Sequence, residues 1–254
     1  MGSGGLGNRG EVEWGVNIRM NNDDSKIVTW NCHGGFFSKE KYAKIEKMDA
    51  DICIIQECDN PAKFENISFL QTYKAFWYGE KAKGLGIFFK KAIPAKELQW
   101  ETCGIQLLCP FLINNILLIA IWAKNNYIED IYTYLTGHEK DIKAFGENVI
   151  VCGDFNSNKI WDSQHNFRNH TAVTRLLMGI GIESYYHLAT GEKQGEEMTP
   201  TFYLYYDEAK PYHIDYCFGN KNKFKEIMVG KYSEWVATSY SDHVPIEIEV
   251  SRFY

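Results

Sequence analysis

The sequence predicts an α/β protein in which two β-sheets pack face to face and helices cover their outer faces. Apolar, β-branched runs bounded by turn residues recur along the chain, from KIVTWN at residues 26–31 to VPIEIEV at residues 244–250. Segments with helical periodicity fall between some of these runs. In addition, 254 residues, of which 45% are hydrophobic and 15% aromatic, are enough to bury the core of one large domain.

The predicted strands are short, rich in Ile, Val, Phe and Tyr, and end at Gly, Asn, Asp or Pro. Several of them are apolar throughout, as expected for strands that are buried on both faces. They comprise residues 26–31, 51–57, 73–78, 86–91, 116–122, 148–154, 200–206, 213–218 and 244–250.

Three segments are predicted to be helices. Residues 38–49 fit an amphipathic helix with Ser38 at its N-cap. Apolar residues from Ile128 to Phe145 keep near-helical spacing and predict a second helix, and residues 168–180 predict a third.

Residues 25–254 are predicted to form a single domain, because we find no repeat, low-complexity tract or long linker. The glycine-rich start, MGSGGLGNRG, has no apolar segment, so residues 1–24 are expected to be a flexible leader, part of it a remnant of cloning. The longest apolar run, ILLIAIWA, is far shorter than the roughly 20 residues of a membrane span. We therefore expect a cytoplasmic protein without a membrane partner.

Charge and cysteine content exclude two further classes. A net charge of −6 argues against a protein that coats long nucleic acid through its overall charge, so any such contact needs a local basic patch. The 7 cysteines include no CxxC pair, and several lie in apolar runs. They are expected to be reduced, packed thiols rather than zinc ligands.

Polar residues stand at the ends of several predicted strands, where a sheet can gather residues that are distant in sequence. The run VIVCGDFN is typical, because four apolar residues lead through Gly153 to Asp154 and Asn156, two residues apart on one side of an extended chain. The candidate site residues at these strand ends are Asn31, Glu57, Asp154, Asn156, Asp215, Asp242 and His243.

These residue types suit phosphate chemistry assisted by a divalent metal. Mg²⁺ takes oxygen ligands, which Glu57, Asn31 and Asp242 could provide. Asp154 could position or deprotonate an attacking water. A protonated His243, oriented by Asp215, could hold the charge that develops on the phosphate.

Each residue also has an ordinary structural interpretation. Glu57 could be a solvated loop residue, and Asp154 with Asn156 could form an Asx turn. Asp215 could be a capping or core carboxylate, and Asp242 could belong to a turn before an edge strand. Their joint occurrence, in this order, favours the functional interpretation.

Five motifs together resemble the endonuclease/exonuclease/phosphatase superfamily. They are TWNCHG, IIQE, GDFN, HIDY and SDHVP, and the resemblance runs from about Lys26 to Val250. GEKAKGLGIFF is also similar to the glycine-bearing strand that follows the metal-binding glutamate in such proteins. The resemblance implies a four-layer α/β sandwich made of two packed mixed β-sheets flanked by helices.

The resemblance also implies roles for the candidate residues. Asn31 and Glu57 match the residues on the metal side, and Asp242 matches a carboxylate of a second metal or of the metal's surroundings. The implied cofactor is Mg²⁺ or Mn²⁺. The implied catalytic residues are the water-activating Asp154, the phosphate-contacting Asn156, the orienting Asp215 and the catalytic His243.

Some positions depart from the family pattern and concern substrate binding. His33 stands where an acidic or amide residue is common, and it either contacts the substrate, alters the metal geometry or is a plain loop residue. Lys124 follows the strand that elsewhere supplies a phosphate-contacting residue, and it could take that role or lie in a solvated loop. Arg168 and His170 stand at the start of the third predicted helix and could hold a flanking phosphate.

We therefore expect a metal-dependent phosphodiesterase or nuclease that acts on nucleic acid or nucleotides. One alternative is a phosphomonoesterase acting on a small substrate such as an inositol phosphate, which the acidic composition and the basic residues near Tyr212 favour. Another alternative is a non-catalytic binding module, which would be expected to have lost at least one of the carboxylates. No obligate protein partner is inferred.

Overall fold

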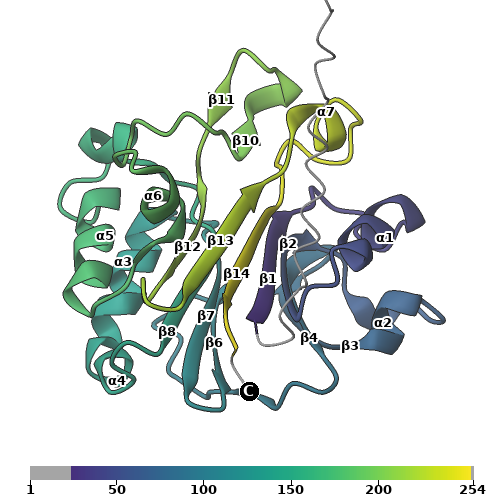
Figure 1. The fold of residues 1–254 in the computed structure, drawn as a ribbon, viewed down its shortest axis with the longest axis horizontal. Helices are drawn as coiled ribbons and strands as arrows, with labels where there is room; N and C mark the ends of the chain where they lie inside the picture. Colours follow the sequence, from purple (N-terminus) through teal and green to yellow (C-terminus); the bar gives the residue numbers. More distant parts are fainter. Residues whose placement is uncertain (1–23, 253–254) are drawn as a thin grey trace, which may run out of the picture.

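Two six-stranded sheets form the centre of the computed structural model, which describes residues 24–252 (Figure 1). Each sheet contains one parallel pair, β1 with β2 and β7 with β8, and its other pairs are antiparallel. The first sheet comprises, in spatial order, β13 (Phe224–Val229), β14 (Ile246–Ser251), β1 (Asp24–Asn31), β2 (Ile52–Cys58), β4 (Lys83–Lys90) and β3 (Tyr73–Glu80). The second comprises β5 (Ala95–Glu97), β6 (Leu108–Ile113), β7 (Ile116–Trp122), β8 (Val149–Asp154), β12 (Asp215–Gly219) and β9 (Glu183–Ser184).

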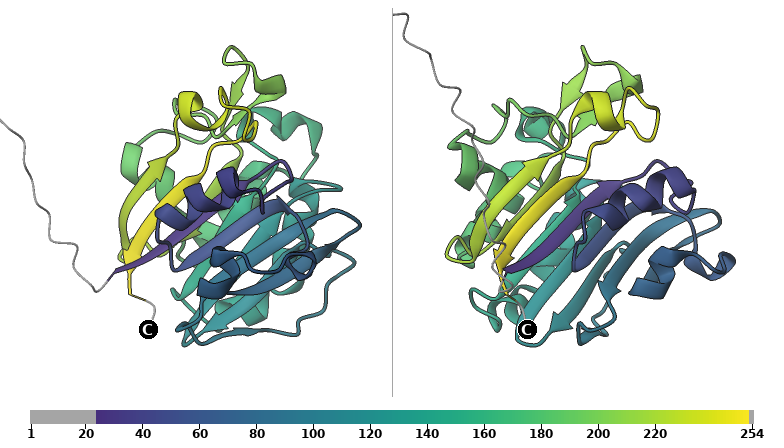
Figure 2. Two further views of the ribbon diagram at one scale, coloured as in Figure 1. Left: turned by 90° about the vertical axis from the view of Figure 1, so that its right-hand side faces the viewer. Right: turned by 45° about the vertical axis from the view of Figure 1, so that its right-hand side comes forward.

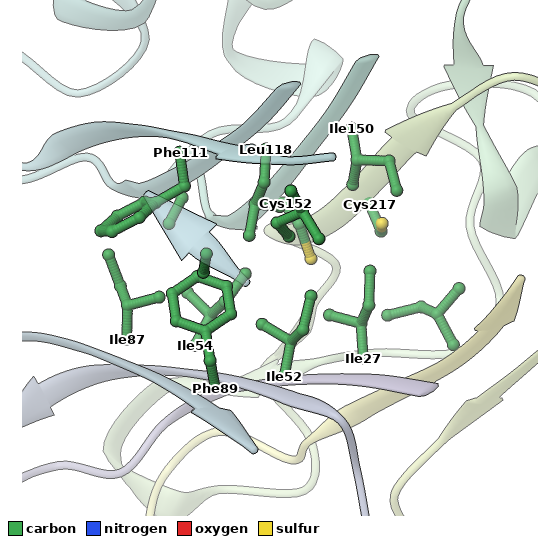
Figure 3. Packing of buried hydrophobic residues seen from close by; sticks show 14 of the residues in the cluster. Ile27, Ile52, Ile54, Ile87, Phe89, Phe111, Leu118, Ile150, Cys152 and Cys217 are labelled. Atoms are coloured by element: carbon green, nitrogen blue, oxygen red, sulfur yellow. The ribbon is translucent and has the colours of Figure 1, made fainter. Parts of the chain in front are cut away.

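The main hydrophobic core lies between the two sheets. Ile52 and Ile54 of β2 face Leu118 of β7 and Cys152 of β8 across this interface (Figure 3). Since β2 and β7 also bury their opposite sides, their sequences are apolar throughout rather than alternating.

Helices cover the outer faces and complete four layers, as predicted. One apolar cluster joins the second sheet to helices that include α3 and α5, and another joins the first sheet to α1, α2 and α7. Further views show α1 and α2 lying against the outer face of the first sheet (Figure 2). The helices are α1 (Lys39–Lys47), α2 (Ser68–Thr72), α3 (Ile128–Gly137), α4 (Glu139–Lys143), α5 (His170–Gly179), α6 (Tyr185–Thr190) and α7 (Tyr232–Trp235), with 3₁₀ turns η1 (Pro61–Lys63), η2 (Lys159–Gln164) and η3 (Leu204–Tyr206).

The parallel pairs explain why polar strand ends meet. A parallel pair needs a crossover, which α1 provides between β1 and β2, and α3 with α4 provides between β7 and β8. In each unit both strands therefore end at the same edge of the sheet. A small hairpin of β10 (Phe202–Tyr203) and β11 (Pro211–Tyr212), together with α7, lies at that edge (Figure 1).

The predicted helix over residues 128–145 is divided in two. The break is at His138, where the backbone leaves helical geometry at φ −108° and ψ 16°. The His138 ring is buried between Trp100 and Tyr134, and its Nε2 lies 2.7 Å from the carbonyl oxygen of Glu101. These buried contacts of His138 stabilise the break between α3 and α4.

The predicted strand over residues 200–206 is mostly wrong. Only Phe202 and Tyr203 pair as a strand, because Tyr205 and Tyr206 have left-handed backbone angles, φ 59° and 62°, and turn the chain into η3. β6 was not predicted, since Pro110 lies in its middle. The edge strands β5, β9 and β13 were also missed, being short or partly exposed.

Other expectations concern cysteines, membrane segments and the start of the chain. All 7 cysteines are free thiols, and of these only Cys103 is exposed. In the described part of the chain, none of the helices has the length and apolar character that crossing a membrane requires. The expected leader lies outside the described residues apart from Asp24, which begins β1.

Candidate active site

Strand register brings the polar strand ends together from both sheets. Asn31 ends β1, and its Cα partner on β2 is Gln56, so Glu57 follows directly beside it. In the second sheet Asp154, the last residue of β8, has Asp215 of β12 as its Cα partner. Asn31 Nδ2 joins the two sheets by donating a hydrogen bond to Asp154 Oδ2 over 3.1 Å.

The segment before β14 is fixed to the end of β1. Ser241 Oγ donates to the carbonyl oxygen of Asn31 over 2.6 Å and accepts from the backbone N–H of His243 over 3.0 Å. Trp30 Nε1 donates to the carbonyl oxygen of His243 over 3.1 Å. These buried hydrogen bonds place His243 in the same site as Asn31 and Asp154.

Asp154 is fully buried and held by amide groups. The backbone N–H of Asn156 donates to Asp154 Oδ1 over 2.8 Å, so the Asx turn considered from the sequence is present. Asn156 Nδ2 also donates to Asp154 Oδ2 over 3.1 Å and to the carbonyl oxygen of Ala123 over 2.8 Å. The turn therefore orients both side chains.

Gly153 is required for this arrangement. A Cβ atom at this position would lie 2.0 Å from the carbonyl oxygen of Ile121 on the neighbouring strand, and φ is 148°. Only glycine lets β8 pass β7 so closely while adopting that angle.

Three residues of the site have a left-handed backbone conformation. His33, Glu57 and Asn156 have positive φ values of 54°, 55° and 46°. Glu57 also lies where the register between β2 and β4 shifts, between Ile55 and Cys58, and such bulges redirect side chains. Strained non-glycine residues are characteristic of functional sites, because the surrounding structure must hold them in place.

Asp215 and His243 form a buried pair. Asp215 Oδ2 lies 2.9 Å from His243 Nδ1, and the side chains are only 1% and 5% exposed. Thr201 Oγ1 accepts the backbone N–H of Asp215 over 3.1 Å, and the Phe202 ring packs on the imidazole at 4.6 Å. The second carboxylate oxygen of Asp215 is buried and has no hydrogen-bond partner among the described residues.

The pKa values of both Asp154 and His243 are raised in this cluster, for different reasons. Burial raises the pKa of Asp154 to about 7, the charge of Asp215 adds to this, and the charge of His243 and the bond from Asn31 oppose it. Burial alone would lower the pKa of His243, but the charge and hydrogen bond of Asp215 outweigh it and raise this pKa to about 9. At neutral pH, His243 is therefore held as a cation, whereas the raised pKa of Asp154 increases the affinity of its carboxylate for a proton.

Glu57 and Asp242 each have a basic partner. Lys83 Nζ binds Glu57 Oε2, and His33 Nδ1 lies 3.2 Å from Asp242 Oδ1. Burial would raise the pKa of Glu57, but the hydrogen bond and charge of Lys83 dominate together and lower it. The charges of His33 and His243 also lower it, so these groups are close enough to interact.

The residues present fit a hard divalent cation. Asp154, Asp215 and His243 offer ligand atoms that lie within 4.8 Å of one another. The orphaned, buried Oδ1 of Asp215 is one atom that a cation or an ordered water would satisfy. Asn31, Asp242 and Glu57 lie around this cluster and add amide and carboxylate oxygens, the ligands that Mg²⁺ and Mn²⁺ accept.

Lys124 is near the site, whereas Arg168 and His170 are engaged elsewhere. Lys124 and Lys83 line one hollow of about 120 Å³, together with Ala123, whose carbonyl binds Asn156. His170 is only 1% exposed, and its Nε2 lies 2.9 Å from Gln194 Oε1. Burial lowers the pKa of His170 to about 4, which leaves it neutral and unsuited to holding a phosphate.

Arg168 is likewise committed away from the cluster. Its guanidinium lies over the Phe167 ring at 5.4 Å, and its Nη1 is 3.4 Å from Thr133 Oγ1 of α3. We therefore leave Arg168 and His170 out of the proposed site.

Three supporting residues were not identified from the sequence. Gln56 Nε2 donates to Thr29 Oγ1 and to the carbonyl oxygen of Ile121, and so connects the two sheets beneath the site. Thr201 supports Asp215, and Lys83 binds Glu57. Gln56 and Lys83 lie within quoted motifs, but their roles depend on partners that only the folded chain reveals.

A four-layer sandwich with buried carboxylates, amides and a carboxylate-bound histidine at the strand ends is a phosphoesterase fold. A family model described as the Endonuclease/Exonuclease/phosphatase family matches residues 28–243, and the chain belongs to this family. This confirms the resemblance seen in the motifs. A search of curated proteins finds no significant match to the sequence.

Solved structures support the same fold at low sequence identity. The 3′ phosphatase NExo from Neisseria, bound to a product DNA hairpin, is similar with a TM-score of 0.67 and 15% identity, covering 89% of this chain and 99% of that one. An AP endonuclease from Archaeoglobus fulgidus has a TM-score of 0.63 and 17% identity, with 88% and 98% covered. D. rerio TDP2, complexed with a single-strand DNA product, has a TM-score of 0.60 and 14% identity, with 90% and 99% covered.

Proposed function

We propose that the protein is a divalent-metal-dependent phosphodiesterase that acts on nucleic acid or nucleotides. One observation carries the proposal: Asp154, held by Asn31 and Asn156, lies in the same buried cluster as the Asp215–His243 pair. This cluster places a proton acceptor and a fixed cation next to each other, as the attack of water on a phosphodiester requires.

Asp154 acts as the general base in this proposal. Its pKa of about 7 allows it to accept a proton from an attacking water at neutral pH. The amides of Asn31 and Asn156 fix its two oxygens, so the water is oriented before the reaction begins.

His243 holds the developing negative charge on the phosphate. Its Nδ1 is bound to Asp215, which leaves Nε2 for a phosphate oxygen. Mg²⁺ or Mn²⁺ held by Glu57, Asn31 and Asp242 would supply further positive charge to the phosphoryl oxygens. Asn156 and Lys124 would contact the phosphate or its neighbour from the other side.

Two of the similar structures contain DNA products, which supports a nucleic-acid substrate as the first choice. The retained carboxylates and the paired His243 weigh against a non-catalytic module. A purified protein incubated with labelled DNA and RNA oligonucleotides and Mg²⁺ or Mn²⁺ tests the proposal.

Asp154→Asn should reduce cleavage by a factor on the order of 1,000, because it removes the proposed general base while preserving the shape of the side chain. Asp141→Asn, which makes the same change on α4 away from the cluster, should cleave like the wild type. Cleavage that persists in both EDTA and Asp154→Asn would exclude this mechanism.

A phosphomonoesterase acting on a small phosphorylated substrate, such as an inositol phosphate, is the second candidate. The net charge of −6 and the small size of the hollow beside the site, about 120 Å³, favour it. Release of inorganic phosphate from a panel of phosphomonoesters, without cleavage of any oligonucleotide, would support this candidate over the first.

A further inference from the structure

A lysine forms an ion pair with Glu57, the carboxylate that we propose as a metal ligand. Lys83 begins β4, and its ammonium binds Glu57 Oε2. The pair is partly protected from solvent, with the Lys83 side chain 42% exposed and the Glu57 side chain 21% exposed. Such a contact competes directly with any cation that approaches the same oxygen.

The path of Lys83 across the site depends on Gly34. A Cβ atom on Gly34 would lie 3.0 Å from Lys83 Cε, and Gly34 has φ +80°. Because glycine has no side chain there, the lysine passes over the turn and reaches Glu57. A second lysine, Lys41, serves a different purpose, because its Nζ binds the carbonyl oxygens of Cys32 and Gly34.

The other carboxylates of the site also have partners of their own. Asp215 binds His243, Asp242 contacts His33, and Asp154 accepts bonds from Asn31 and Asn156. The two divalent ions of a two-metal site lie about 3.5–4 Å apart and need several carboxylate oxygens between them. A second ion would have to displace at least one of these partners.

We propose that Lys83 is a positioning residue that acts as a built-in counter-ion: it holds Glu57 by one oxygen, limits the centre to one divalent cation and weakens the affinity for that cation. This inference rests on the proposed metal centre at Glu57. Lys83 holds the carboxylate in place at the site, while its positive charge repels a divalent ion at the other oxygen. The ammonium supplies the fixed charge that a second metal would otherwise provide.

The test is Mn²⁺ binding by the full chain without substrate, measured by calorimetry and by electron paramagnetic resonance of the free ion. The wild type should bind one Mn²⁺ per chain. Lys83→Met should bind Mn²⁺ roughly tenfold more tightly, because it removes a unit positive charge beside the ligand. Lys83→Arg keeps the charge and should bind like the wild type.

Lys81→Met is the matched control, since Lys81 is an exposed lysine in the turn of the same hairpin. It should leave Mn²⁺ affinity unchanged, and thermal unfolding in EDTA checks that every variant is folded. The proposal is overturned by two Mn²⁺ ions per wild-type chain, or by a folded Lys83→Met variant with unchanged or weaker affinity. If Lys83→Met does not fold, Lys83→Gln removes the same charge and should likewise bind Mn²⁺ more tightly than the wild type.

These outcomes separate this inference from the proposed function. A wild type that binds no Mn²⁺ and cleaves in EDTA would overturn both. A wild type with metal-dependent cleavage but an unaltered Lys83→Met affinity would overturn only the role of Lys83.

Discussion

At the scale of single residues, the charge on His243 is decided by Asp215. Both side chains are buried, so water cannot stabilise the imidazolium, and the carboxylate at 2.9 Å must do so. Asp154 and Asp242 lie further down the order of charges that raise the pKa of His243. This order predicts which substitution changes the protonation of the site most.

Asp215→Asn should lower the pKa of His243 from about 9 to below the ordinary value of 6.5, because burial then acts without its compensating charge. Nitrogen-15 NMR titration of the histidines in EDTA measures this, with the His243→Gln spectrum giving the assignment. Asp242→Asn should lower the pKa by less. An equal shift in both variants would contradict the dominant role of Asp215.

The same pair makes stability depend on pH in a defined direction. The pKa of His243 is higher in the folded state than its ordinary 6.5, so the pair contributes fully below pH 6.5 and loses its contribution as the pH rises through about 9. The destabilisation caused by Asp215→Asn should therefore shrink above pH 9 in thermal unfolding.

At the scale of structural elements, the segment between α6 and β10 helps to hold Asp215 in place. Glu197 accepts bonds from the backbone N–H of Gly195, from Asn158 Nδ2 and from His187 Nε2. The segment continues to Thr201, which binds the backbone of Asp215. The Glu197 carboxylate thus makes several of the hydrogen bonds that hold a loop without a regular element of its own.

Glu197→Gln should reduce stability at pH 7, and the reduction should fade in acid. Burial opposes the ionised form, but the bonds from His187 and Asn158 lower the pKa of Glu197 from 4.5 to about 2. The contribution is therefore present above pH 4.5 and is lost as the pH falls toward 2. Thermal unfolding across this range measures it, with Glu196→Gln, an exposed neighbour, as control. A difference that stays constant between pH 7 and pH 3 would contradict the prediction.

Elements differ in how far the sequence predicts them. The buried strands β1, β2, β7 and β8 were predicted because their apolar runs end abruptly in polar residues, and that feature also located Asn31 and Asp154. β6 and the turn at Tyr205 were not predicted, because a proline and two left-handed tyrosines contradict the local pattern. In such cases tertiary contacts override local preference.

The residues of the site likewise differ in how far the sequence predicts them. Its charged residues stand in short motifs and could be found, whereas Thr201 and Lys83 act through partners more than ten residues distant in sequence. His170 lies at the start of a helix, as predicted, but its side chain faces the interior. The spacing along the chain predicted where His170 lies in the helix, but not the direction in which its side chain points.

At the scale of the whole molecule, the proposed function requires an acidic chain to bind an anionic substrate. The net charge is −6, and the lysines that line the hollow beside the cluster are Lys83 and Lys124. A protein that follows a long nucleic acid by electrostatics would instead need many phosphate contacts. The binding of a nucleic acid should therefore involve few ionic contacts and depend weakly on salt.

Binding of a labelled single-stranded oligonucleotide to Asp154→Asn, followed by fluorescence anisotropy at several KCl concentrations, measures this dependence. One or two phosphates neutralised by lysines should give a slope of log K against log salt no steeper than about −1.4. Lys124→Met, made in the same background, should reduce that slope by about 0.7, since one phosphate contact is lost. Lys96→Met is the control, because Lys96 lies opposite Leu112, toward the other end of the β6–β7 hairpin. A slope near −5 would instead indicate an extended basic surface that contacts many phosphates, and the local mode of binding would then be wrong.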